Sequence, residues 1–394
     1  ACFDKAYKTL YDKRTEDSPS KFASLLNKSE AYFMLKRYDD AYATFSEYVE
    51  TSRNKYGKTS GTYSQALFAL ANIEGARGNI NEADSLFRMS MNCLLVNMKQ
   101  LWRYSTPSQR EQFWMETLNN LSGMAAFAVK CGNFDSELTE TCYNALLFSK
   151  SLLLETEKSV VDIIRKEGTD DDIANYRNLL AVNNRLLVLR NNYEYNKLEI
   201  DSLTIQQREL EQRLSHRCQS YNEYETYLDI NYEKVRNSLA NHEVVVDFSA
   251  YQTEDSVRQY AAYIYDKDKS HPLLVKCFDQ QQLDSLLDGM QNFTLYNYEQ
   301  LQDRASKLIW KPIEANIAKG STVYYIPSGV MHGIALEALP LSDGTTLGQH
   351  YDFVRLTSAR EIVNAHHSNK INRTATLYGG LQYSLAPQKM EEES

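Results

Sequence analysis

The chain has 394 residues, enough for two or three domains, and its 43% hydrophobic and 24% charged residues are typical of a soluble globular protein. The formal net charge of −9, without a basic stripe, argues against nucleic acid as a partner. No apolar run reaches the roughly 18 residues of a membrane-spanning helix, so we expect no membrane segment in this chain. Glycine (15) and proline (7) are scarce, which favours long helices over many turns.

The cysteines are scattered along the chain, at positions 2, 93, 131, 142, 218 and 277. None has a CxxC or other metal-binding spacing, so we expect neither a metal site nor a cofactor. Reduced thiols of this kind are typical of a cytoplasmic protein, which is the location we expect. Cys142 and Cys218 lie in helical patterns and Cys277 in a strand-like run, and we interpret all three as buried structural thiols rather than nucleophiles.

Two helix–turn–helix units repeat in the first part of the chain at an offset of 42 residues. The matched positions include Leu25 with Leu67, Ala41 with Ala83, and Phe45 with Phe87. In each unit the alanine lets two helices approach closely, and the ring four residues later fills the space against the next unit. A weaker third unit runs through residues 132–134 into 142–148. The alternative interpretation is a non-repetitive helical bundle.

Neither glycine nor proline occurs between Gly168 and Pro272. An apolar stripe with heptad-like spacing runs from Leu179 to Leu214 in this stretch. We therefore predict one very long helix or a helical hairpin over residues 170–238. The polar side that includes Glu211 is expected to face solvent.

After Glu243 the pattern changes to short apolar runs that are typical of strands. We predict strands near 244–248, 260–265, 273–278, 323–327, 353–356 and 375–380, with a turn at 266–270. Helices are expected from Leu283 to Met290 and from Tyr298 to Ile317. Strands that alternate with helices in this way indicate an α/β sheet.

Three further features could suggest a chemical site. His332 follows a predicted strand, and we interpret it as a structural loop residue rather than a catalytic one. The adjacent His366 and His367 are expected to be a surface pair near a helix C-terminus rather than a metal site. Gly379 and Gly380 lack the spacing of a phosphate-binding loop. We therefore assign no catalytic, cofactor-binding or metal-binding residue.

Four passages together resemble the CHAT family, caspase-fold peptidases that are fused to tetratricopeptide repeats in bacteria. They are residues 143–155, similar to the helix that closes the repeat array; 244–248 with 260–265, similar to the opening hairpin; 323–339, with its strand, Pro-Ser-Gly turn and Glu-Ala-Leu; and 377–383, similar to the first core strand. The helical units also resemble the tetratricopeptide repeat, although their offset of 42 residues exceeds the usual period of about 34.

The resemblance implies an α plus α/β fold: a tetratricopeptide-like superhelix over residues 1–155, a long helical connector or hairpin over 156–240, and the N-terminal part of a caspase-like domain over 241–394. It implies a cysteine peptidase with a His–Cys dyad. The dyad matches no residue here, so we expect this chain to be inactive alone. The repeats are expected to bind or sense a protein or peptide partner through exposed aromatic side chains. The alternative is a non-catalytic scaffold with a structural CHAT-like domain, and the acidic charge disfavours a DNA-binding repeat protein.

Overall fold

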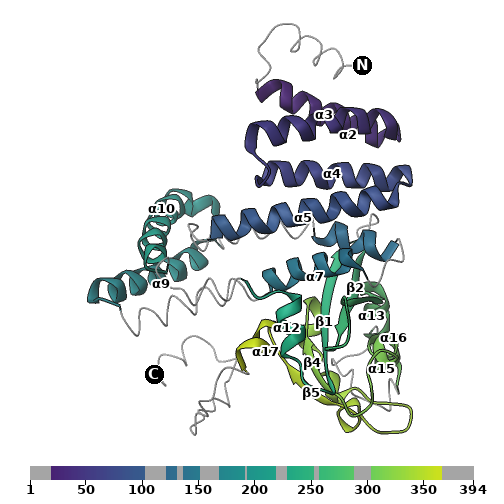
Figure 1. Ribbon diagram of the computed structural model, residues 1–394. Helices are drawn as coiled ribbons and strands as arrows, with labels where there is room; N and C mark the ends of the chain where they lie inside the picture. The colour runs from purple at the N-terminus through teal and green to yellow at the C-terminus, as the bar shows by residue number, and fades with distance from the viewer. Residues whose placement is uncertain are drawn as a thin grey trace.

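The structure, a computed structural model, describes residues 19–102, 121–130, 136–150, 168–190, 193–218, 229–252, 257–287 and 303–365. These residues form a stack of helices, a helical hairpin and a five-stranded mixed sheet (Figure 1). The predicted class of α plus α/β is therefore confirmed at this level.

The helical stack begins with α2 (Pro19–Met34), α3 (Tyr38–Tyr56), α4 (Gly61–Arg77) and α5 (Ile80–Trp102), each packed against the next (Figure 1). The leucine, alanine and phenylalanine positions of the 42-residue repeat are all buried, with no more than 3% of any of these residues exposed. Gly78 ends α4 in the left-handed conformation, with a φ of 87°, which favours glycine. The predicted helix pairing is confirmed for these two units.

A third pair follows in the stack. Residues 121–130 are helical and pack closely on α4, since a Cβ added to Gly123 would lie 2.5 Å from the ring of Phe68. The second helix, α7 (Glu137–Ser149), begins with a capping box at Ser136 and packs against α5. The turn expected at 132–134 lies outside the described residues.

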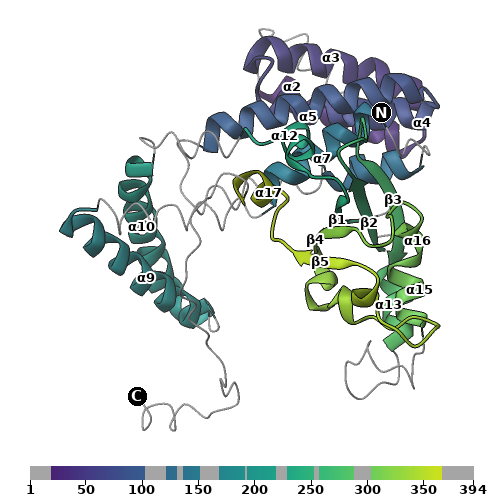
Figure 2. The ribbon, with the colours of Figure 1, turned by 60° about the horizontal axis from the view of Figure 1, so that its bottom comes forward.

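Helices α9 (Asp170–Arg190) and α10 (Tyr193–Cys218) form a hairpin with an apolar core of its own, set apart from the stack (Figure 2). The predicted apolar stripe supplies this core: Leu179, Val182, Leu186, Leu189, Ile200, Leu210 and Leu214. The hairpin interpretation is therefore confirmed and the single long helix is wrong. The expected exposure of Glu211 is also wrong, because this residue lies beside Leu210 and one turn before Leu214 and is only 3% exposed.

The predicted strands are confirmed as far as the structure describes them. They are β1 (Glu243–Gln252), β2 (Arg258–Tyr265), β3 (Leu273–Asp279), β4 (Thr322–Ile326) and β5 (Asp352–Arg355), and the sheet order is β3-β2-β1-β4-β5. β2 is antiparallel to β1 and to β3, whereas β1, β4 and β5 run parallel. Asp247 on β1 is opposite Tyr263 of β2 and Ile326 of β4. The strand expected at 375–380 lies outside the described residues.

One face of the sheet is covered by α13 (Gln280–Leu287), α15 (Arg304–Ile309) and α16 (Lys311–Glu314). The single helix predicted from Tyr298 to Ile317 is wrong in its described part. It is broken at Trp310, because Pro312 in the first turn of α16 has no N–H to continue the α15 ladder.

The other face of the sheet is covered by α7, α12 (Tyr232–Ser238) and α17 (Arg360–Ala365), and its core is continuous with that of the helical stack (Figure 2). Tyr232 and Val235 of α12 are buried in this core. The predicted hairpin was expected to extend to residue 238, but residues 232–238 form the separate helix α12, which packs with the sheet. Side chains alternate between the faces of a strand, so Val245, Asp247 and Tyr251 of β1 all lie on the face that meets the helical stack.

Candidate functional site

A groove of about 1520 Å³ lies where the helical stack meets the sheet. Its walls are the first helices of three successive pairs, α2, α4 and residues 121–130, and its end is formed by β1 and β3. Helix α4 contributes one face to the groove: Gln65, Ala66, Ala69, Asn72, Ile73 and Ala76. Small-molecule pockets are about 300–1,000 Å³. The groove is larger than such a pocket and is therefore suited to a segment of another macromolecule.

The groove has an apolar floor and an exposed apolar rim. Phe45 and Ile73 are buried in the floor, whereas Met34 and Ile80 on the rim are 81% and 40% exposed. Exposed apolar side chains gathered around a hollow are typical of an interaction surface. The aromatic residues Phe33 and Phe127 are half-buried here, so the exposed contacts offered to a partner are largely aliphatic rather than aromatic.

The sheet end of the groove is joined directly to its helical wall. The backbone N–H of Gln252, at the end of β1, donates a hydrogen bond to Ser122 Oγ at 2.7 Å. The neighbouring Tyr251 is 3% exposed, and burial raises the pKa of its hydroxyl to about 12. Both residues line the groove together with Lys276 of β3. A molecule in the groove therefore contacts the helical stack and the sheet at the same time.

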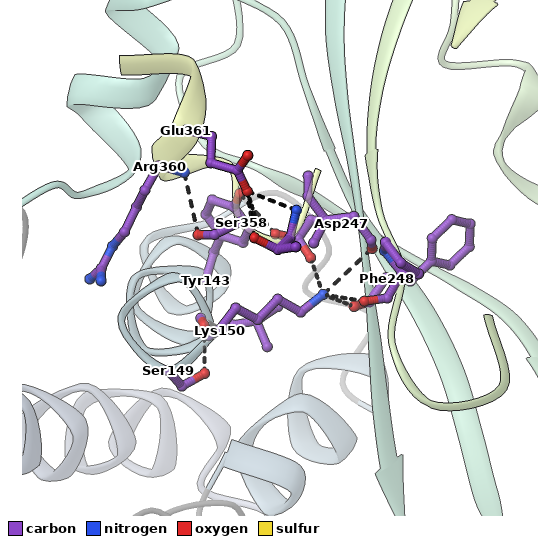
Figure 3. Close-up of polar contacts among 12 residues, drawn as sticks. Tyr143, Ser149, Lys150, Asp247, Phe248, Ser358, Arg360 and Glu361 are labelled. Atoms are coloured by element: carbon purple, nitrogen blue, oxygen red, sulfur yellow. Dashed lines mark hydrogen bonds and ion pairs between the residues drawn. The ribbon is translucent and has the colours of Figure 1, made fainter. Parts of the chain in front are cut away.

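A second junction between stack and sheet is a buried ion pair (Figure 3). Lys150, directly after α7, donates from Nζ to Asp247 Oδ1 at 2.5 Å, and the two side chains are 12% and 0% exposed. The same ammonium group donates to the carbonyl oxygens of Phe248 at 2.6 Å and Pro327 at 3.2 Å. These contacts bind the end of α7 to the middle of β1 and to the residue that follows β4.

Tyrosine hydroxyl groups complete this buried network. Tyr143 donates to Asp247 Oδ2 at 3.2 Å, and its hydroxyl oxygen lies 2.8 Å from that of Tyr265. Tyr232 of α12 packs edge-on against Tyr265, with ring centroids 4.9 Å apart. Burial raises the pKa values of Tyr143 and Tyr265 well above their ordinary value, so both remain protonated donors.

The network holds the end of α7 in position against β1. Loss of hydration lowers the pKa of Lys150 and raises that of Asp247. The attraction between the two charges acts in the opposite direction on both pKa values. The three protons of the ammonium group face four acceptors, which are Asp247 Oδ1 and the carbonyl oxygens of Phe248, Ile326 and Pro327. Neither group was singled out from the sequence. The available signal was Asp247 itself, a charge inside an apolar strand run that requires a buried partner.

His332 lies in the short 3₁₀ helix η1 (Gly329–Gly333), with its side chain exposed. Its carbonyl oxygen accepts a hydrogen bond from Arg355 Nη2 at 2.7 Å. Partial burial, and then the charges of Lys150 and Arg355, lower the pKa of its imidazole. These contacts fit the expected loop role, in which the imidazole is neutral at pH 7.

The described cysteines are not activated thiols. Cys142 is 1% exposed, and burial raises its pKa to about 12. Cys277 was expected to be buried but is half-buried, and the loss of hydration at its thiol raises its pKa to about 12. The burial expected for Cys142 is confirmed. Cys218 ends α10, and nothing is described of its side chain, whereas the histidine pair at 366–367 and the glycine pair at 379–380 lie outside the described residues.

Within the described ranges, no three His, Cys, Asp or Glu side chains gather closely enough to hold a metal ion. None of the helices described is both long and apolar enough to cross a membrane. No family model matches the chain, and no curated protein matches it. The fold and the groove therefore define the class of protein: stacked helix pairs that share a groove with a mixed α/β sheet.

Proposed function

We propose that this chain is a partner-binding protein, in which tetratricopeptide-like helix pairs hold a segment of another protein in the groove beside a CHAT-like sheet. The observation that carries the proposal is the lining of the groove by the first helix of three successive pairs. Stacked helix pairs present their binding surface in this way, as a continuous hollow across neighbouring units.

The CHAT-like part of the proposal is supported by two passages that form the expected elements. Residues 244–248 and 260–265 lie in the antiparallel pair β1 and β2. Residues 323–339 form a strand followed by two short 3₁₀ helices. As part of a TPR–CHAT protein, the groove would sense the partner on behalf of a caspase-like cysteine peptidase.

The second candidate is a non-catalytic scaffold, and the cysteines favour it for the described residues. A cysteine nucleophile reacts as a thiolate. At neutral pH, thiols with a pKa of about 12, such as those of Cys142 and Cys277, are protonated. Partner binding in the groove is common to both candidates.

The proposed partner binding is tested by blocking the groove with a substitution and measuring peptide affinity. Peptides of 16 residues are selected from a random displayed library against the full chain, and their affinities are measured by fluorescence anisotropy. Ala69 is half-buried on the α4 wall, so Ala69→Arg fills the groove with a long charged side chain. We expect it to weaken binding at least tenfold, or about 1.4 kcal/mol.

Ala43→Arg is the matched control, because Ala43 is an exposed residue of α3 that does not line the groove. It should leave the affinity unchanged. Thermal unfolding establishes that both variants are folded, and Asn72→Trp on the same wall is the second blocking variant. Selected peptides that bind both blocked variants as tightly as the parent chain would refute the proposal.

A further inference from the structure

We infer that the occupant of the groove is an amphipathic helix of about three turns whose acidic C-terminal end meets the sheet. The inference rests on the proposed function and specifies the partner's chemistry. It draws on the walls of the groove, its length and the placement of its charges.

The walls favour a helix over an extended segment. The N–H and C=O groups within α2, α4 and residues 121–130 are bonded along their own helices and offer no ladder to an incoming chain. Tyr251 and Gln252 already pair with β2, and Lys276 is the only residue of the edge strand β3 at the groove. Along α4, an extended segment would find only the side chains of Gln65 and Asn72 as partners for its backbone groups, whereas a helix satisfies its own.

The dimensions set the length of this helix. With a spacing of roughly 8–10 Å between successive walls, the value for neighbouring helices, the distance from α2 across α4 to residues 121–130 is about 16–20 Å. At about 1.5 Å per residue, a helix that crosses this distance has about 11–13 residues. One apolar stripe at spacings of three and four residues would cover the floor, which includes Ala66 and Ile73.

The charges set its direction. Glu30 on α2 is exposed at one end of the groove, and the sheet with Lys276 lies at the opposite end of the stack (Figure 1). Lys130, exposed at the end of the helix at 121–130, also lines the groove. The N-terminus of a helix is partly positive and its C-terminus partly negative. The partner's N-terminus therefore lies toward Glu30, and its acidic C-terminal end toward Lys276.

Three fluorescein-labelled peptides of 14 residues test the inference on the full chain by fluorescence anisotropy. All have a leucine stripe at i, i+3, i+4 and i+7 on an alanine and glutamine background. One ends in three glutamates, the second ends in three lysines, and the third is the glutamate peptide with two central prolines. We expect the helical glutamate peptide to bind at least tenfold more tightly than either of the others.

Lys276→Glu should remove most of the preference for the glutamate end, a reduction of at least fivefold in the affinity ratio. Lys319→Glu is the matched control, since Lys319 is exposed and lies outside the groove, and it should leave the ratio unchanged. The glutamate peptide failing to bind, binding no better than the lysine peptide, or binding as well with prolines would each overturn the inference.

The outcomes separate this inference from the proposed function. Library-selected peptides that lose binding in Ala69→Arg but are neither helical nor acidic at one end would leave partner binding intact and refute the helical occupant. Sedimentation velocity of the chain alone adds one more arm. A dimer that forms with rising concentration and is lost in Ala69→Arg would make a second copy the occupant, which also overturns the inference.

Discussion

The helical stack meets the sheet at two junctions of opposite character. At the buried junction, Lys150 and Asp247 are held with every proton of the ammonium group accepted by the protein. At the open junction, Gln252 bonds to Ser122 at the end of a groove whose rim exposes Met34. A charged pair withdrawn from water has few alternative arrangements, whereas apolar side chains in contact with solvent can adapt to an incoming surface.

The interface between the stack and the sheet therefore holds the two parts in position and also leaves a surface for a partner. The buried network gives the stack a defined position on the sheet, so the two walls of the groove keep their spacing. The open end leaves apolar and charged groups for a partner. If this division holds, substitutions at the buried junction lower stability, and substitutions at the open junction change binding.

Removing Asp247 has the largest expected effect. Asp247→Ala leaves the Lys150 ammonium buried without its counter-charge, and breaking such a pair costs about 3–5 kcal/mol of the free energy of unfolding. Urea denaturation followed by circular dichroism measures the loss. The double variant Lys150→Met with Asp247→Leu should recover much of it, because no buried charge remains. A loss below about 1 kcal/mol in the single variant would mean that the junction is not a buried anchor.

The hydroxyl of Tyr143 gives a smaller, graded test. Tyr143→Phe removes the second donor to Asp247 and the contact with Tyr265, and should cost about 2 kcal/mol. Tyr324→Phe is the matched control: its hydroxyl donates to Glu243 at 2.8 Å, but both residues are partly exposed, so water can replace the bond. We expect a cost of about 0.5 kcal/mol there. If the two variants lost the same free energy of unfolding, the buried hydrogen bonds of Tyr143 would be no more stabilising than the exposed one of Tyr324.

At the open junction, the free energy of unfolding should depend little on the charge of Lys276. Lys276 is exposed, and its reversal to glutamate should change the free energy of unfolding by less than about 0.5 kcal/mol while altering peptide preference. The same urea titration measures this change. A destabilisation comparable to that of Asp247→Ala would show that the groove end is also part of the structural anchor.

Much of the fold could be predicted from local patterns. The repeat positions, such as Ala41 and Phe45, are spaced by helical periodicity, and the strands of the sheet are short apolar runs, so each could be found within a window of a few residues. The break at Trp310 was missed because the apolar spacing continues through Pro312, although the proline itself was a visible signal.

The two junctions could not be predicted in the same way. Lys150 and Asp247 are 97 residues apart in sequence, and Gln252 and Ser122 are 130 apart. Their meeting depends on how α7 and the helix at residues 121–130 lie against the sheet, which no local pattern encodes. The sequence contained only an unexplained charge, Asp247, between apolar neighbours. A buried charge predicts that a partner exists without saying which residue it is.

The smallest expected effect is on the pKa of His332, an exposed residue that is influenced by the charge of Lys150 at the buried junction. Its pKa is lowered by partial burial and by the positive charges of Lys150 and Arg355. The unfolded chain therefore takes up this proton first as the pH falls through about 6.5, so the residue's contribution to stability decreases below that pH. NMR titration of the imidazole should give a midpoint below 6.5, and Arg355→Gln should raise it by removing one charge. A midpoint that Arg355→Gln leaves unchanged would place His332 outside the field of these groups.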